Sequence, residues 1–306
     1  MRLMPTARLA VIGVGPWGTN IVRTILASPH MDLVAIASAK RREEIARIGP
    51  FSGPLLADYR ELAGLRDGID GIVLATPPEH RPEQIDFFLD LGVPVFAEKP
   101  LTLRANETSR LLAKARVLGV PLVEDLVHVY SWPYRSICSQ VGSGRVDIES
   151  CGGNDGPVRT YSPLFDYGPH DMAMSLRIFR CRPQRIAAGV FNVKSVRQFC
   201  VSVELDFGPA GTATMSFGNA FDSKRRWFRL RDAKNDWVAD DLQASKLRRN
   251  GVPLSPEKHE STPLAAALES FAGHRVVLTA AESARLSDNV AGVLDDIESQ
   301  IAPHLP

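Results

Sequence analysis

Two short motifs in this chain carry side chains that can move protons. Glu98-Lys99-Pro100 follows an apolar run that ends near residue 97, and Asp166-Tyr-Gly-Pro-His170 lies far beyond it. A lysine acts as an acid or base when burial or a nearby cation lowers its pKa, and a histidine titrates near neutral pH. The carboxylate of Asp166 can hold the histidine tautomer. These motifs predict proton transfer at an oxygen bound to carbon, with Lys99, His170 and Asp166 as candidate catalytic residues.

Each of these residues also has a structural explanation. A lone lysine after a strand is commonly a solvated surface group, and Glu98 could be its ion-pair partner or could anchor the backbone. A helix beginning near His170 would be capped by an aspartate, with the histidine packed in the core. His128 is a weaker candidate of the same kind, which could simply pack against a sheet. Spacing alone leaves both explanations open.

A glycine-rich segment near the start of the chain predicts a dinucleotide site. The spacing Gly-x-Gly-x-x-Gly follows the apolar run 9–12 and precedes a helical pattern over 20–27. The first glycine of such a segment makes a tight turn, the second admits the pyrophosphate, and the third lets helix and strand pack closely. The helix N-terminus adds unpaired N–H groups. The alternative is a turn that binds nothing. The expected cofactor contacts here are Gly13, Gly15, Pro16, Trp17 and Gly18.

The end of the second expected strand bears on which nicotinamide dinucleotide binds. NAD selection commonly uses an acid about 20 residues beyond the glycines, which accepts from the ribose 2′-hydroxyl. That position holds Ser38, and the next carboxylate is Glu43. A hydroxyl beside cations suits the 2′-phosphate of NADP. We therefore expect NADP or NAD, with NADP slightly preferred, and Ser38, Lys40 and Arg41 as phosphate contacts. Alternatively, these cations begin a solvated helix.

Strand and helix patterns alternate over residues 8–125. Short apolar runs at 9–12, 33–37, 71–75, 93–97 and 121–124 predict strands, and helical spacing predicts helices at 20–27, 41–48, 82–91 and 105–118. Repeated strand–helix units form a parallel sheet with helices on both faces, and ligands bind at its carboxyl edge. A proline-rich turn at that edge could also be purely structural. The further cofactor candidates expected at this edge are Thr76, Pro77, His80, Glu98 and Lys99.

The pattern changes after about residue 128. Apolar and polar residues alternate over 201–207, 212–217 and 227–231, and Gly208-Pro-Ala-Gly211 has the composition of a turn. Helices are expected at 264–271 and 280–297, and loops at 142–163 and 241–263. The predicted fold class is α/β. A dinucleotide-binding Rossmann domain with a doubly wound parallel sheet spans 1–125, and an α+β domain with an open, mainly antiparallel sheet spans 126–306 for substrate binding and oligomerisation.

The charge balance and the cysteine spacing of the chain limit the classes of partner and ligand that we expect. The 36 basic and 35 acidic residues give a net charge of +1, so we expect neither nucleic acid nor an acidic membrane as partner. The four cysteines have no metal-ligand spacing, and no metal site is expected. The sequence also lacks an apolar run of about 18 residues and a leader pattern. The expectation is a cytoplasmic protein.

Taken together, the motifs resemble those of the Gfo/Idh/MocA family of oxidoreductases, and the resemblance covers nearly the whole chain. The Glu-Lys-Pro segment directly after the apolar run 93–97 is the most specific part, whereas the glycine motif is common to many families. Pro263-Leu264 followed by Phe271 is similar to the closing segment of the family. The segments that carry the resemblance are 13–18, 75–80, 95–102 and 166–170.

The resemblance implies that Lys99 contacts the reacting hydroxyl, that His170 is the general acid/base, and that Asp166 assists it or binds a substrate hydroxyl. It implies hydride transfer to the nicotinamide C4, a sugar, cyclitol or sugar-nucleotide substrate, and a homodimer or homotetramer. Trp17 and the Gly-Pro-His-Asp segment at 168–171 are similar to the sugar-nucleotide branch.

Some positions depart from the family pattern. Many members carry an acid three residues after the histidine, where this chain has Ala173, and the NAD-selecting acid is absent at Ser38. The second domain is also short for the family. These departures motivate an alternative function, a non-catalytic dinucleotide-binding sensor or partner protein that retains the fold.

Overall fold

The computed structural model describes residues 6–40, 42–256 and 260–306. They divide into two compact units, one with the chain up to Val127 and residues 261–288, the other with residues 128–260 and 289–306. The sequence assigned all of 126–306 to one domain, whereas the structure places 261–288 with the first unit. Each unit is described below by itself.

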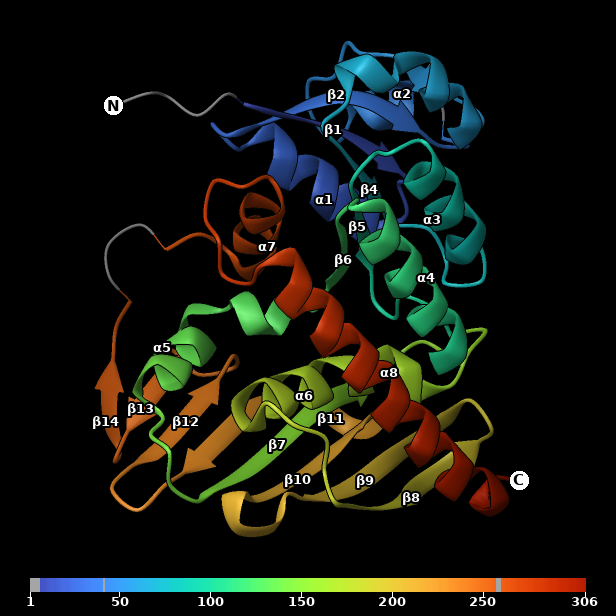
Figure 1. Ribbon diagram of the computed structural model, residues 1–306. Coiled ribbons are helices and arrows are strands. Elements are labelled where there is room, and N and C mark those ends of the chain that lie inside the picture. Colours follow the sequence, from blue (N-terminus) through green and yellow to red (C-terminus); the bar gives the residue numbers. More distant parts are fainter. Residues whose placement is uncertain (1–5, 41, 257–259) are drawn as a thin grey trace. The chain divides into compact units, whose positions relative to one another are not determined.

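The described residues of the first unit form a six-stranded sheet in the order β3-β2-β1-β4-β5-β6 (Figure 1). Every recorded strand pair in it is parallel. The order reverses between β1 and β4, as in the Rossmann fold, so a crevice for ligands is expected at the carboxyl ends there. This confirms the predicted doubly wound sheet. The strands are β1 (Ala7–Ile12), β2 (Met31–Ala37), β3 (Leu55–Leu56), β4 (Gly71–Leu74), β5 (Val95–Glu98) and β6 (Leu122–Asp125).

Helices connect these strands because apolar residues recur at helical spacing between the runs. The predicted helix at 105–118 is found with the same bounds, and Gly119 ends it in the left-handed region at φ 68°. The sequence did not predict β3 or the 3₁₀ segment η1 (Tyr59–Gly68), which Asp58 and Glu61 cap reciprocally. The helices are α1 (Pro16–Leu26), α2 (Arg42–Ala46), α3 (Arg81–Asp90) and α4 (Ala105–Leu118).

Helix α7 (Pro263–Phe271) belongs to the first unit because its last aromatic ring packs into the sheet. The ring centroid of Phe271 lies 5.6 Å from that of Phe96 on β5. At Gly71 on β4, a Cβ would lie 2.7 Å from the Phe271 ring. Thr262 caps the helix through a hydrogen bond from the Ala265 N–H to its hydroxyl. The first unit is therefore completed by a segment far along the chain.

The described residues of the second unit form an eight-stranded sheet in the order β14-β13-β12-β11-β7-β10-β9-β8. Among its recorded pairs only β7 with β10 is parallel, which confirms a mainly antiparallel sheet. Helix α6 (Pro163–Phe179) covers one face of the central strands (Figure 1). The strands are β7 (Val146–Asp155), β8 (Arg185–Ser195), β9 (Gln198–Asp206), β10 (Gly211–Gly218), β11 (Ala220–Arg231), β12 (Asp236–Asp240), β13 (Leu247–Arg249) and β14 (Val252–Leu254).

The remaining helical elements are short, except for α8 near the C-terminal end of the chain. Helix α8 contains the boundary between the units, which falls after Asp288. No helix in the described part of the chain is long and apolar enough to cross a membrane. These elements are η2 (Val127–Tyr130), α5 (Trp132–Gln140), η3 (Gly208–Ala210), α8 (Ala280–Ile301) and η4 (Ala302–His304).

Two predicted loops contain strands. The segment 142–163 includes β7, which lies between β10 and β11 in the middle of the sheet. Its glycines misled the sequence interpretation, because Gly153 is required by packing: a Cβ there would lie 2.3 Å from the Gly218 carbonyl oxygen. The segment 241–263 includes the hairpin of β13 and β14, joined by Asn250 at φ 52° and Gly251 at φ 79°. Asn-Gly is a strong hairpin signal.

Candidate active site

The three glycines of the turn between β1 and α1 differ in how much space surrounds them. Gly13 has φ 87°, where an L side chain is strained, and a Cβ would lie 3.0 Å from the Ala75 carbonyl carbon. A Cβ at Gly18 would lie 2.1 Å from the Gly13 carbonyl oxygen. At Gly15, by contrast, a Cβ would meet none of the described atoms within 4 Å. Gly13 and Gly18 are thus needed for packing, whereas Gly15 leaves open space beside the backbone.

The N-terminus of α1 is suited to an anion. Gly15 is its N-cap residue, Pro16 and Trp17 follow, and the structure shows no side-chain cap for the described residues of this turn. Its first turn contains no acidic residue. The unpaired N–H groups and the positive end of the helix dipole therefore face the open space at Gly15. This is where the sequence predicted a pyrophosphate.

Ser38 and Lys40 lie directly after β2, as predicted. The Ser38 N–H donates to the Leu56 carbonyl oxygen at 3.0 Å, which fixes the turn against β3. The Lys40 N–H donates to the Ser38 hydroxyl oxygen at 3.2 Å, so the two residues form one compact turn. The hydroxyl proton of Ser38 is still available to a ligand. Arg41, the third predicted phosphate contact, lies outside the described residues.

The loop after β4 presents different groups from those we expected. The Thr76 hydroxyl donates to the Gln84 side-chain oxygen at 2.6 Å, so this side chain is bonded to α3. Pro77 and His80 are exposed. His80 is the N-cap residue of α3, with no side-chain cap hydrogen bond recorded among the described atoms. Among the predicted cofactor contacts of this loop, Pro77 and His80 are therefore more accessible than Thr76.

A buried arginine, which the sequence analysis missed, joins the loops after β4 and β5. Arg81 is 4% exposed. Its Nε donates to the Thr76 carbonyl oxygen at 2.8 Å, and its Nη1 donates to the carbonyl oxygens of Glu98, at 2.6 Å, and Pro100. These bonds hold the backbone on both sides of Lys99. Arg81 follows His80 at what looks like a solvated helix start, so its burial has no local sequence signal.

Lys99 is half-buried, and its peptide bond to Pro100 is cis. Glu124 on β6 also supports this loop, because its Oε1 accepts from the Leu101 N–H at 2.9 Å. Glu98 was expected to pair with Lys99 or to anchor the backbone. Its side chain is buried beside Asp125 of β6, with the charge of Lys99 close enough to act on both carboxyl groups.

The second motif lies within α6 rather than at its start. The sequence analysis placed the helix N-terminus near His170, but Ser162 caps the helix, accepting from the Leu164 N–H at 3.2 Å. Asp166 and His170 are therefore one turn apart on the same helix face. Asp166 Oδ2 lies 3.3 Å from Arg159 Nε, and His170 is 7% exposed.

His128 contacts His170 directly. Their ring centroids are 4.4 Å apart with an interplanar angle of 89°, an edge-to-face arrangement. His128 belongs to η2, the short segment after β6. No local sequence pattern predicts this contact, because the two histidines are far apart in the chain.

Asp171 is buried on a different side of α6. It is 1% exposed, and its Oδ2 lies 3.9 Å from Arg226 Nη1 on β11. Burial raises the pKa of Asp171, and the Arg226 charge opposes this. Gly152 leaves room for the pair, because a Cβ there would lie 2.8 Å from Arg226 Nη1 and 2.9 Å from Asp171 Oδ2. The ion pair of Asp171 with Arg226 thus links α6 to strand β11 of the sheet.

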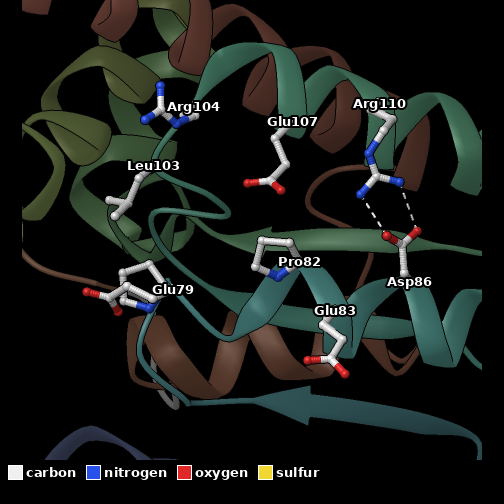
Figure 2. Close-up of a pocket in the computed structure, with 9 residues that line it drawn as sticks. Glu79, Pro82, Glu83, Asp86, Leu103, Arg104, Glu107 and Arg110 are labelled. Carbon is white, nitrogen blue, oxygen red and sulfur yellow. Dashed lines mark hydrogen bonds and ion pairs between the residues drawn. The ribbon is translucent and has the colours of Figure 1, made fainter.

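A surface groove of about 530 Å³ lies between α3 and α4 (Figure 2). Its charges are largely paired: Asp86 contacts Arg110 at 2.6 Å and Lys114 at 2.9 Å, and Glu83 contacts Arg60. Neither the glycine turn nor Lys99 lines it. Within the described residues, no group of three or more His, Cys, Asp or Glu side chains could hold a metal ion.

Comparison with known proteins identifies the first part of the chain. Residues 7–125 match the GFO_IDH_MocA model, described as an oxidoreductase family with an NAD-binding Rossmann fold. The Rossmann part of this chain belongs to the Gfo/Idh/MocA oxidoreductase family. This confirms the family that the sequence motifs resembled.

One curated relative of this chain is the dTDP-3,4-didehydro-2,6-dideoxy-alpha-D-glucose 3-reductase of Streptomyces violaceoruber. It is 31% identical over 168 residues, which cover 54% of this chain and 46% of the relative. The match thus spans less than half of the relative's length.

Two solved structures match almost the whole length of this chain. A protein described as an oxidoreductase, from Magnetospirillum magnetotacticum, has a TM-score of 0.82 at 26% identity, covering 95% of this chain and 99% of its own. A mutant 3-ketoreductase from Actinomadura kijaniata, in complex with TDP-benzene and NADP, has a TM-score of 0.76 at 19% identity, covering 97% and 98%. The second comparison shows a shared fold.

The structure also locates one departure from the Gfo/Idh/MocA pattern. Ala173, which stands where many members carry an acid, is completely buried in α6. The nearby acid, Asp171, faces Arg226 instead and cannot replace it on the face of His170. The polar residues at this helical spacing are Asp166, His170 and Arg177.

Proposed function

We propose that this protein is an NAD(P)-dependent oxidoreductase that transfers hydride between the nicotinamide and a secondary alcohol or ketone of a sugar, cyclitol or sugar nucleotide. The observation that carries the proposal is the carboxyl edge of the first sheet. There the open space at Gly15, beside an α1 N-terminus without a side-chain cap, suits a pyrophosphate, and the backbone around Lys99 is fixed by buried Arg81. The 3-reductase relative and the TDP- and NADP-bound neighbour favour a sugar nucleotide among these classes.

In this reaction the bound nicotinamide supplies or accepts the hydride. The residues of the chain move the proton: Lys99 donates a hydrogen bond to the reacting oxygen and stabilises its developing negative charge, and His170 acts as the general acid/base. Asp166, one turn before His170, orients the imidazole or binds a substrate hydroxyl. His128, in contact with the His170 ring, positions it.

The direct test is hydride transfer measured with a panel of dTDP- and UDP-sugars, free sugars and inositols, each with both cofactors. We expect turnover with a nucleotide sugar. Cofactor binding without turnover on any compound would favour the non-catalytic alternative, for which the buried Ala173 is the structural argument.

We further propose that NADP is preferred over NAD, because Ser38 and Lys40 form one turn after β2 and the first carboxylate after that strand is Glu43. Parallel titrations with NADPH and NADH, followed by nicotinamide fluorescence, test this. We expect tighter binding of NADPH, and we expect Ser38→Asp to reverse the order because its carboxylate repels the 2′-phosphate and accepts from a 2′-hydroxyl. Equal affinities in the unmodified protein would contradict the proposal.

We also propose assembly into a homodimer or homotetramer through the face of the eight-stranded sheet that α6 leaves uncovered. Light scattering on the full chain tests this. A monomer at micromolar concentration would contradict it.

A further inference from the structure

Two carboxyl groups lie side by side at the ends of β5 and β6. Glu98 and Asp125 are paired residues in the parallel register, so their side chains leave the same face of neighbouring strands, which run about 4.8 Å apart. Both are buried, with 7% and 1% of their surfaces exposed. Two adjacent carboxylates in such a place repel each other and lose their hydration.

The surroundings do not provide enough donors for two anions. Among the described atoms, Glu98 Oε1 and both carboxyl oxygens of Asp125 are buried without a hydrogen-bond donor in regular geometry. The indole N–H of Trp17, from the glycine-rich turn, reaches the pair and favours the ionised form of each carboxyl. Within the described part of the chain, three of the four carboxyl oxygens of the pair are therefore buried without a regular hydrogen bond.

Nearby positive charges offset part of the negative charge of the two carboxyl groups. Lys99 lies beside the pair, and Arg81 acts on Glu98 although several of its N–H groups are bonded to carbonyl oxygens. Glu124 adds a third buried carboxyl on the same strand as Asp125. Burial, followed by the negative charge of Glu98, raises the pKa of Asp125 well above its usual value. Burial also raises the pKa of Glu98, against the opposing effects of a hydrogen bond with Asp125 and of the charges of Arg81 and Lys99.

A single proton shared by the two carboxyl groups removes both their repulsion and part of their need for donors. A protonated carboxyl is a hydrogen-bond donor, so one proton turns two repelling acceptors into a donor–acceptor pair with one negative charge. We propose that Glu98 and Asp125 share one proton at neutral pH and that the resulting monoanion is a positioning pair for Lys99. The role at Lys99 rests on the function proposed above, whereas the shared proton does not.

The pair of Glu98 and Asp125 also lies close to two of the predicted cofactor-binding residues, Trp17 and Lys99. Trp17 belongs to the turn that would bind the pyrophosphate, and Lys99 follows Glu98 directly. The negative charge of the monoanion attracts the Lys99 side chain, which can donate a hydrogen bond to a substrate oxygen. Because Trp17 and Lys99 meet at the same pair, a change in its charge acts on both.

The shared proton is tested without any assay of activity. We expect the infrared difference spectrum between the unmodified protein and Asp125→Asn at pH 7 to show the carbonyl stretch of one protonated carboxylic acid, lost in the variant. Glu98→Gln should remove the same band, because the remaining carboxyl is then ionised and accepts from the new amide. Glu124→Gln, a matched buried control, should retain it. Absence of the band from both differences would overturn the proposal.

The role at Lys99 is tested by the pH dependence of kcat/KM. Each single variant keeps one negative charge, so we expect the basic limb of the profile to stay in place. The double variant, Glu98→Gln with Asp125→Asn, loses that charge, and the limb should move to lower pH by roughly one to three units, the usual effect of an opposite charge nearby. A double variant with an unmoved limb would overturn the positioning role. If the unmodified protein transfers no hydride at all, the proposed function fails while the infrared result still decides the shared proton.

Discussion

The two units hold their site residues in different ways. In the first unit, contacts of the backbone position the site residues. Gly13 and Gly18 fit because they lack side chains, and Arg81 fixes the Lys99 loop by donating to carbonyl oxygens. In the second unit, Asp166 and His170 share a helix face and meet His128 and Arg159 through side chains. Backbone contacts tolerate few substitutions, whereas side-chain contacts can be replaced by similar groups. The comparison therefore predicts different sensitivities in the two units.

The largest effect is expected at Lys99. We expect Lys99→Ala to lower kcat by about 10²–10⁴-fold, the usual contribution of a positioned acid or base. Lys114→Ala is the matched control, because Lys114 belongs to the same unit but pairs with Asp86 and Asp90 on the surface. Near-normal turnover in Lys99→Ala would refute the proposed mechanism.

Arg81 should be the most sensitive position for stability. Arg81→Ala leaves carbonyl oxygens that the guanidinium now pairs without their donor, so we expect a loss of about 3 kcal/mol in the free energy of unfolding. Arg110→Ala removes a partly exposed arginine that pairs with Asp86, and should cost about 1 kcal/mol or less. Chemical denaturation of both variants measures the difference. Equal losses would mean that backbone anchoring is not special to this unit.

The glycine turn allows binding and folding to be separated. Gly18→Ala places a Cβ against the Gly13 carbonyl oxygen, and we expect a loss of about 1–3 kcal/mol from overpacking. Gly15→Ala meets only open space, so stability should change by less than about 0.5 kcal/mol while dinucleotide affinity falls. Thermal melting and cofactor titration distinguish the two. A Gly15→Ala protein that binds cofactor normally would show that the pyrophosphate lies elsewhere.

The smallest effect is expected in the second unit. If His128 acts by ring contact, His128→Ala should lower kcat several-fold, and His128→Phe should restore most of it because the aromatic edge is retained. Steady-state kinetics with a fixed cofactor concentration measures both. Failure of phenylalanine to restore activity would assign His128 a proton or a hydrogen bond rather than a packing role.

The same contrast explains what the sequence could predict. The strands and helices around the glycine turn were found because each depends on local patterns: a run of buried residues, a helical spacing, a glycine at a helix end. The proximity of His128 to His170, and of Asp125 to Glu98, depends on which strands and helices become neighbours. No local pattern records that.

Misinterpreted segments have physical reasons as well. Strand β7 was predicted as a loop because Gly152 and Gly153 disfavour strands in general, yet here they make room for Arg226, Asp171 and the Gly218 backbone. The start of α6 was misplaced because Pro169 lies inside the helix and was taken as its beginning. In β7, tertiary contacts outweighed the local preference.

The return of α7 to the first unit has a consequence for synthesis. A ribosome releases residues in order, so strands β1 to β6 emerge long before Phe271 is available to cover Phe96 and Gly71. The nascent Rossmann sheet must wait, with this apolar patch uncovered, while the whole second sheet is translated. At about 5–20 residues per second that interval lasts on the order of ten seconds, ample time for a chaperone to bind the patch.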